Sequence, residues 1–134
     1  MNRTAKPEPI TKLTGMSAGQ IFGTVNGMSV VGLDIAKAVF QMHTVDMGTG
    51  EVINIQIHRA KLMEYFANKA PCLIGIEACG SAHHWARELG ALGHTVRLIH
   101  AKLVRPFVSG NKSDLTDARG IWLAIQQPAS NLLA

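Results

Sequence analysis

Two short apolar runs in this chain each end in an acidic residue, and this feature limits the possible folds more than any other. Residues 30–33 lead into Asp34, and residues 72–76 lead into Glu77. An apolar run of this length predicts a strand buried on both faces, as in parallel sheets covered by helices. Because a buried strand seldom ends in a carboxylate that has no partner, we expect both acids to belong to one site.

The segments around these runs alternate between strand and helix patterns. We predict strands over residues 30–34, 38–45, 51–57, 72–77 and 95–99, and helices over residues 59–68, around Trp85 and Leu89, over 100–108 and over 114–126. The first three strands should form an antiparallel meander, and the fourth should pair parallel to the first. This order predicts an α/β fold of the ribonuclease-H-like class, with a mixed sheet flanked by helices.

A glycine stands two residues before each of the two acids, at Gly32 and Gly75. Residues two apart in a strand face the same side of the sheet, so each glycine shares a face with its acid. A glycine at such a position leaves room for a helix to approach the sheet closely. The alternative is that both glycines only relieve crowding within a buried sheet.

A second pair of acids, Asp114 and Asp117, opens the last predicted helix. Their spacing places both side chains on one face of that helix. We expect them to join Asp34 and Glu77 in a site of four carboxylates. The alternative is that Asp114 caps the helix and Asp117 interacts favourably with the helix dipole.

The composition is that of a globular protein with a basic surface. The 134 residues suffice for one domain with a real core, and the formal net charge is +4. Four of the nine acidic residues are site candidates, so the remaining surface is more basic and suits a polyanionic partner. No apolar run is long enough to predict a membrane span.

The first residues and the two cysteines predict the domain bounds and the cellular location. Residues 1–27 are rich in glycine and proline without any period, which predicts a flexible extension before a folded domain over residues 28–130. They lack the apolar core of a signal peptide. Cys72 and Cys79 have no second pair with which to form a zinc site, which favours reduced thiols and a cytoplasmic protein.

From Val31 to about Pro128, the sequence resembles the DEDD transposases of the insertion-sequence 110 family. The resemblance is carried by GLDIAK at residues 32–37, GIEACG at 75–80, the stretch over 89–96, and GNKSDLTDAR at 110–119. It implies a RuvC-like domain of the ribonuclease H fold. It also implies that Asp34, Glu77, Asp114 and Asp117 are the catalytic acids and the ligands of Mg²⁺ or Mn²⁺, the hard cations that prefer oxygen donors.

The same resemblance implies partners and a missing part. Members of the family act on DNA in transposition, are associated with a structured guide RNA, and continue into a second domain with a serine nucleophile. No serine of this chain matches that nucleophile, so we expect an isolated or truncated amino-terminal domain. Such a domain could pair with itself or with full-length transposase.

Basic residues near the proposed site are candidates for nucleic-acid binding. Lys112 stands two residues before Asp114, and Arg119 follows Asp117. We expect these two residues, together with Lys102 and Arg105, to contact phosphates, which positions a nucleic acid without reading its sequence. The alternative is a scattered, solvated surface.

Two other functions are alternatives to the transposase interpretation. The segment GLDIAK also resembles the first phosphate loop of actin-like ATPases, but that fold needs a second similar domain and a later glycine-rich loop, which this sequence lacks. A non-catalytic, regulatory or remnant DNA- or RNA-binding fragment is the other alternative. Nuclease activity would distinguish the transposase reading from that fragment.

Overall fold

The computed structural model describes residues 23–35, 38–108 and 114–127, with the side chains of residues 114–116 left out. The elements are β1 (Thr24–Val25), β2 (Met28–Asp34), β3 (Val39–Val45), β4 (Val52–His58), α1 (Arg59–Ala67), β5 (Cys72–Glu77), α2 (Ala82–Ala91), β6 (Thr95–Ile99), α3 (Ala101–Val104), the 3₁₀ turn η2 (Arg105–Phe107) and α4 (Asp114–Ala124). The predicted strands and helices are confirmed in type and order. The predicted helix over 100–108 is divided into α3 and η2, because Pro106 has no N–H with which to continue α3.

The sheet has the predicted mixed topology. Its strand order is β4-β3-β2-β5-β6, and β1 pairs only with β2. Strands β2, β3 and β4 are antiparallel neighbours, whereas β5 runs parallel to β2, and β6 runs parallel to β5. An antiparallel meander extended by parallel strands is the arrangement predicted for a ribonuclease-H-like fold, and the prediction of this α/β class is confirmed.

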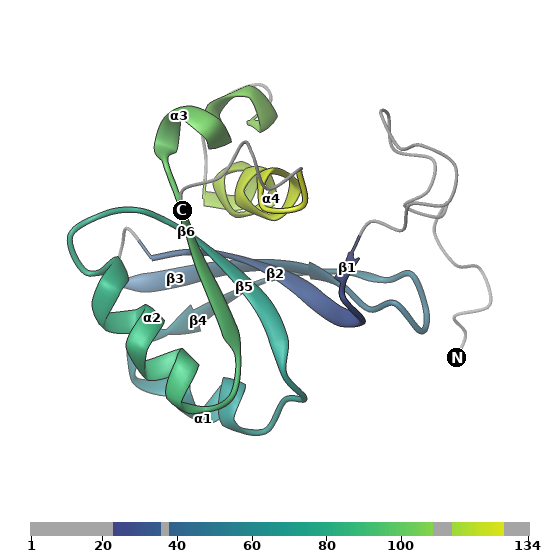
Figure 1. The fold of residues 1–134 in the computed structure, drawn as a ribbon, viewed down its shortest axis with the longest axis vertical. Helices are drawn as coiled ribbons and strands as arrows, with labels where there is room; N and C mark the ends of the chain where they lie inside the picture. The colour runs from purple at the N-terminus through teal and green to yellow at the C-terminus, as the bar shows by residue number, and fades with distance from the viewer. Residues whose placement is uncertain (1–22, 36–37, 109–113, 128–134) are drawn as a thin grey trace.

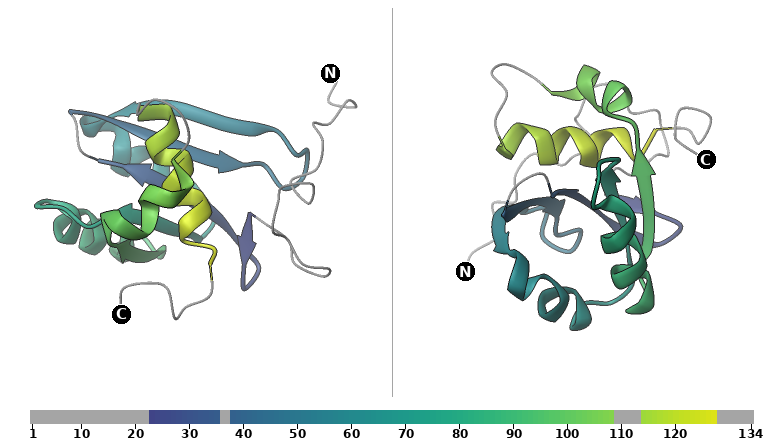
Figure 2. Two further views of the ribbon diagram at one scale, coloured as in Figure 1. Left: turned by 90° about the horizontal axis from the view of Figure 1, so that it is seen from above. Right: turned by 90° about the vertical axis from the view of Figure 1, so that its left-hand side faces the viewer.

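Helices cover both faces of the sheet (Figure 1). Helices α1 and α2 pack on one face, where the core contains Phe40, Leu62 and Trp85. Helices α3 and α4 lie on the other face, where Trp122 packs against Val30 (Figure 2). Alternate residues of each central strand therefore contribute to cores on opposite faces of the sheet. Because both faces are buried, the sequence of each central strand is a continuous apolar run.

The sheet begins before the predicted boundary at Met28. Residues 1–22 of the predicted extension lie outside the described part of the chain. Strand β1 pairs with β2 through a two-residue turn in which Asn26 and Gly27 both have positive φ, 52° and 81°. Asn-Gly is the sequence preferred for such a hairpin turn. The backbone N–H of Gly23 then donates a hydrogen bond to Oε1 of Gln126, which ties this hairpin to the end of α4.

Candidate functional site

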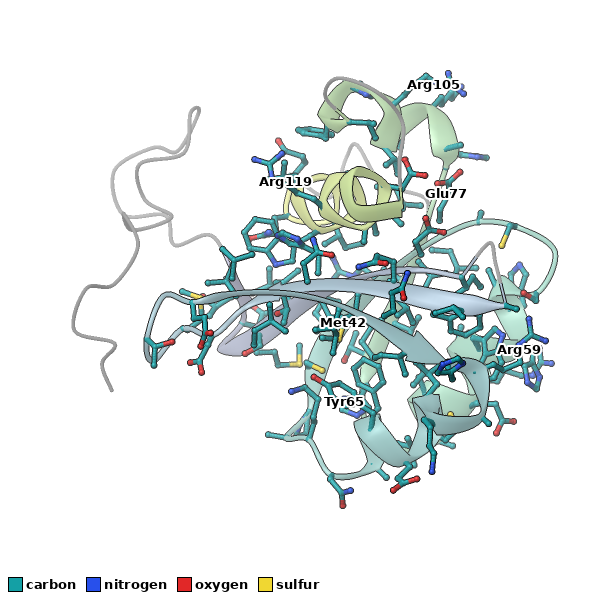
Figure 3. The ribbon with its side chains drawn as sticks, turned by 180° about the vertical axis from the view of Figure 1, so that it is seen from behind. Met42, Arg59, Tyr65, Glu77, Arg105 and Arg119 are labelled. Carbon is teal, nitrogen blue, oxygen red and sulfur yellow. The ribbon has the colours of Figure 1, made fainter. Side chains whose placement is uncertain are left out.

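Asp34 and Glu77 come from neighbouring parallel strands and lie at the same edge of the sheet. Strands β2 and β5 are in register up to the pair Leu33 and Ile76, so the two acids follow this pair side by side. Both acids are half-buried. Figure 3 shows Glu77 on the side of the sheet that carries α3 and α4. Parity places Asp34 on the same side, two residues beyond Gly32.

The two glycines allow α4 to lie directly on the sheet. A Cβ atom on Gly32 would collide with the backbone carbonyl of Ala118 and would lie 2.6 Å from the backbone N of Trp122. A Cβ atom on Gly75 would lie 3.1 Å from the Cβ of Ile125. The prediction that these glycines make room for a helix is therefore confirmed, and that helix is the one that carries the second pair of acids.

The direction of α4 brings its first turn toward the edge where Asp34 and Glu77 lie. Nε1 of Trp122 donates a hydrogen bond of 3.0 Å to the carbonyl of Val30, while Ala118, one turn earlier, faces Gly32. Moving back along α4 therefore means moving forward along β2, toward Asp34. The first turn of α4 contains Asp117, which is half-buried and whose Oδ1 is shielded from solvent.

The complete set of four carboxylates stays a prediction. Asp114 begins α4, but its side chain lies outside the described part of the chain. Among the residues that are described, no three His, Cys, Asp or Glu side chains are grouped closely enough to hold a metal ion. The fold thus brings the elements that bear Asp34, Glu77 and Asp117 to one edge of the sheet.

Three of the four basic candidates lie on the α4 side of the sheet. Lys102 in α3 and Arg105 in η2 are exposed, and Arg119 in α4 is half-buried. Figure 3 shows Arg105 above α4, away from the sheet, and Arg119 at the side of α4. Lys112 lies outside the described residues. Contact between these residues and a nucleic acid stays a prediction.

The structure places a row of polar side chains beside Asp34 that the sequence patterns did not predict. Gln41 is the β3 partner of Asp34, and His43 is the β3 partner of Gly32. Nε2 of Gln41 donates a 2.6 Å hydrogen bond to Oδ1 of Asn54, and the Nδ2 of Asn54 lies 2.7 Å from Nδ1 of His43. Because an amide nitrogen can only donate, Nδ1 of His43 accepts, and the neutral ring carries its proton on Nε2.

The surroundings of His43 keep this ring neutral. Burial, followed by the positive charge of Arg119, lowers the pKa of His43 to about 4. The ring also makes an edge contact with the Trp122 ring, with 5.2 Å between the ring centres. In the sequence, only the alternation of Gln41 and His43 along β3 could have predicted this buried polar row. The same alternation is also typical of a strand whose polar face is exposed to water.

Comparison with known proteins identifies relatives of one functional class. The chain is 50% identical over 102 residues to a probable family 20 transposase of Pseudomonas aeruginosa, in an overlap that covers 76% of this chain and 30% of the relative. It is 33% identical over 106 residues to the transposase for insertion sequence element IS1328 of Yersinia enterocolitica, an overlap that covers 79% of this chain and 32% of the relative. The chain is a relative of insertion-sequence transposases.

The similarity covers only part of the length of each transposase. A third relative, the transposase for insertion sequence element IS1111A of Coxiella burnetii, is 34% identical over 99 residues, which cover 73% of this chain and 27% of that protein. The chain thus spans about 27 to 32% of the length of these three curated relatives. No family model and no solved structure matches it.

The names of these relatives test one part of the predicted resemblance, which is the functional class. The prediction of an insertion-sequence transposase is confirmed by their names. Membership of the DEDD or insertion-sequence 110 group stays a prediction. In the described part of this transposase relative, none of the helices is long and apolar enough to cross a membrane.

Proposed function

We propose that the chain is the RuvC-like part of a DEDD transposase of the insertion-sequence 110 type, which binds DNA and supports its metal-dependent cleavage and strand transfer. The observation that supports this most directly is the placement of Asp34 and Glu77 at the ends of adjacent parallel strands, on the face where α4 begins. The names of the relatives support the transposase class. The chain spans less than a third of these relatives, so the reaction of the whole transposase belongs to this proposal.

The donor atoms fit Mg²⁺ or Mn²⁺. Carboxylate oxygens are the ligands that these hard cations prefer, and Asp34, Glu77, Asp114 and Asp117 would hold the metal. The bound metal would supply positive charge that stabilises the reacting oxygens of a phosphodiester. The protein itself supplies the spacing of the acids, which depends on the close contact between α4 and the two glycines. Mutual repulsion among the acids should be relieved by the metal.

The basic residues would guide DNA to this edge. Lys102, Arg105 and Arg119 lie on the same side of the sheet as Glu77, and Lys112 precedes α4 in the sequence. Phosphate contacts of this kind supply affinity that weakens with salt. A structured guide RNA and a cytoplasmic location belong to the same proposal. So does association with further copies of the chain or with full-length transposase.

A non-catalytic role for the chain is the second candidate. It is favoured by the small share of each relative that the chain spans. A fragment of this kind would bind DNA, RNA or full-length transposase without cutting. Metal-dependent nicking of DNA by the purified chain would exclude this role, whereas metal binding alone would not.

The metal site is tested by thermal unfolding in a titration with Mg²⁺ and Mn²⁺. A metal that binds only the folded chain at one hundred times its Kd raises stability by about 2.7 kcal/mol. Asp34→Asn should remove most of this gain and should raise the stability of the metal-free protein, because one repelling charge is gone. Asp114→Asn replaces the carboxylate by an amide of nearly the same size, so the variant should fold normally while its metal response falls.

Glu64→Gln is the control for these variants. Glu64 is exposed on α1 and pairs only loosely with Lys61, at 3.7 Å. Its replacement should change neither the metal-free melting temperature nor the response to metal by much. If the wild-type chain and Asp34→Asn show the same response to both metals, the four-carboxylate site is wrong.

A further inference from the structure

Strand β4 is an edge strand without the usual protection against pairing. Within the described residues it pairs only with β3. Its seven residues contain no charged side chain, proline or glycine. Natural edge strands usually carry a lysine, a proline or a bulge that blocks further pairing. Strand β6, at the opposite edge, is shorter and has Arg97 at its centre.

Apolar side chains are exposed along this edge. Val52 is 54% exposed and Ile55 is 37% exposed, and the remaining exposed large apolar side chain in the described ranges is Leu92, at the end of α2. Ile55 is the partner of Met42, and Ile57 is the partner of Phe40, so both isoleucines belong to the face that carries the α1 and α2 core. The apolar layer of the core therefore continues to an open strand.

We propose that β4 pairs antiparallel with β4 of a second copy of this chain, in a symmetric register centred on Ile55. The strand VINIQIH is self-complementary in this register. Ile55 lies opposite Ile55, and Ile53 opposite Ile57, on the apolar face. Asn54 lies opposite Gln56 on the other face, where two amide side chains can form hydrogen bonds across the strands.

The sequence of β4 favours this register and this partner. A shift by one residue would place Ile55 opposite Gln56 and would mix the two faces, which a half-buried strand opposes. An antiparallel pair of identical strands is a two-fold contact that closes after two copies. It would join two sheets into one and place both copies of α4 on the same face. The pairing specifies the association between copies that belongs to the proposed function, and it uses none of the proposed metal ligands.

The mass of the purified full chain in solution tests the pairing. Sedimentation over a range of protein concentrations should show twice the mass of the chain, decreasing to the mass of one chain on dilution. Ile55→Lys should give one chain at every concentration, because two lysines would face each other at the two-fold axis. Leu92→Lys is the matched control, since Leu92 is also 37% exposed, and it should leave the mass of the wild type unchanged.

Cysteine cross-linking tests the register. In a Cys79→Ser background, Ile55→Cys should form a disulfide between two copies under mild oxidation, because facing Cα atoms in an antiparallel pair lie about 5 Å apart. Val52→Cys should not, because the two copies of residue 52 would lie about 20 Å apart along the strands. Cys72 is buried and remains in both variants.

The proposal is overturned by a wild-type mass of one chain at every concentration, or by an Ile55→Lys variant that associates as the wild type does. Equal cross-linking of the two cysteine variants would exclude the register. Thermal unfolding of each variant shows whether it is folded. The metal titration is a separate thermal-unfolding measurement. Failure of the pairing and failure of the metal site can therefore be distinguished.

Discussion

At the scale of single residues, His43 shows how burial changes the chemistry of a side chain. Its ring lies between the sheet and α4, accepts a hydrogen bond from Asn54 and contacts Trp122. Protonation would place a second positive charge near Arg119 and would turn the Nδ1 acceptor into a donor that faces the Asn54 amide. The folded protein therefore holds His43 neutral, next to the edge that bears Asp34.

We predict that His43 makes the fold less stable in acid. Its pKa is about 4 in the folded protein, below the ordinary value of 6.5. Between these values the unfolded chain binds the proton more readily, so the free energy of unfolding falls as pH drops from 6.5 to 4. The loss from this residue should approach about 3 kcal/mol.

Urea unfolding of the wild type and of His43→Gln at a series of pH values measures this effect. The variant should show a flatter pH dependence within the window, and above pH 7 the two curves should run parallel. His58→Gln, which alters an exposed histidine, should keep the pH dependence of the wild type. Identical slopes for the wild type and His43→Gln would contradict the prediction.

At the scale of elements, the contact between α4 and the sheet positions the candidate site. Ala118 and Trp122 lie against Gly32, and Ile121 and Ile125 lie against Gly75. Any side chain at Gly32 would push α4 away from the sheet and would move Asp117 relative to Asp34. The two strand glycines are therefore part of the geometry of the site, although neither contributes a functional group.

We predict that Gly32→Ala lowers the free energy of unfolding by about 3 kcal/mol, because the new methyl group overpacks the interface between β2 and the backbone of α4. Gly75→Ala should cost less, because its nearest neighbours are side-chain atoms of Ile125 and Ile121 that can shift. Chemical denaturation measures both effects. The metal response should fall in Gly32→Ala, even in protein that remains folded.

Gly90→Ala is the control for glycine replacement. Gly90 lies within α2, and an added Cβ would have no neighbour within 4 Å in the described structure. Alanine is the better helix former, so this change should raise stability by about 0.5 to 1 kcal/mol. If Gly32→Ala were as well tolerated as Gly90→Ala, the close approach of α4 would not matter for the site.

At the scale of the whole molecule, the chain corresponds to less than a third of each curated relative described above. Its described residues form a mixed sheet with helices on both faces, together with the edge that bears Asp34 and Glu77. That its serines do not include the nucleophile of the family that it resembles stays a prediction from the sequence. The proposed binding of metal and DNA can be measured on this chain separately from strand exchange.

We predict that the purified chain alone does not complete strand exchange between donor and target DNA, with or without added RNA. The reason is that the family resemblance assigns strand exchange to a serine of a second domain, and carboxylates do not provide such a nucleophile. Gel analysis of labelled donor and target duplexes measures the joined product. DNA binding by the same preparation, measured by fluorescence anisotropy, is the positive control, and recombinant product from this polypeptide would refute the prediction.

The sequence by itself determined the types and order of the elements and the faces shared by Gly32 with Asp34 and by Gly75 with Glu77. These properties depend on the period of consecutive residues, which is local. The Asn26-Gly27 hairpin was also locally encoded, but it lies within a segment whose glycines and prolines suggested an extension.

Only the tertiary structure decided the direction in which α4 crosses the sheet, the neutral state of His43, and which strand lies open at the edge. Each of these depends on residues far apart in the chain, such as Val30 with Trp122, or His43 with Asn54 and Arg119. The pattern of one strand or one helix shows which face is apolar, but it contains no information about which distant surface that face will meet. That choice is made by packing, because the elements must bury their apolar faces against one another.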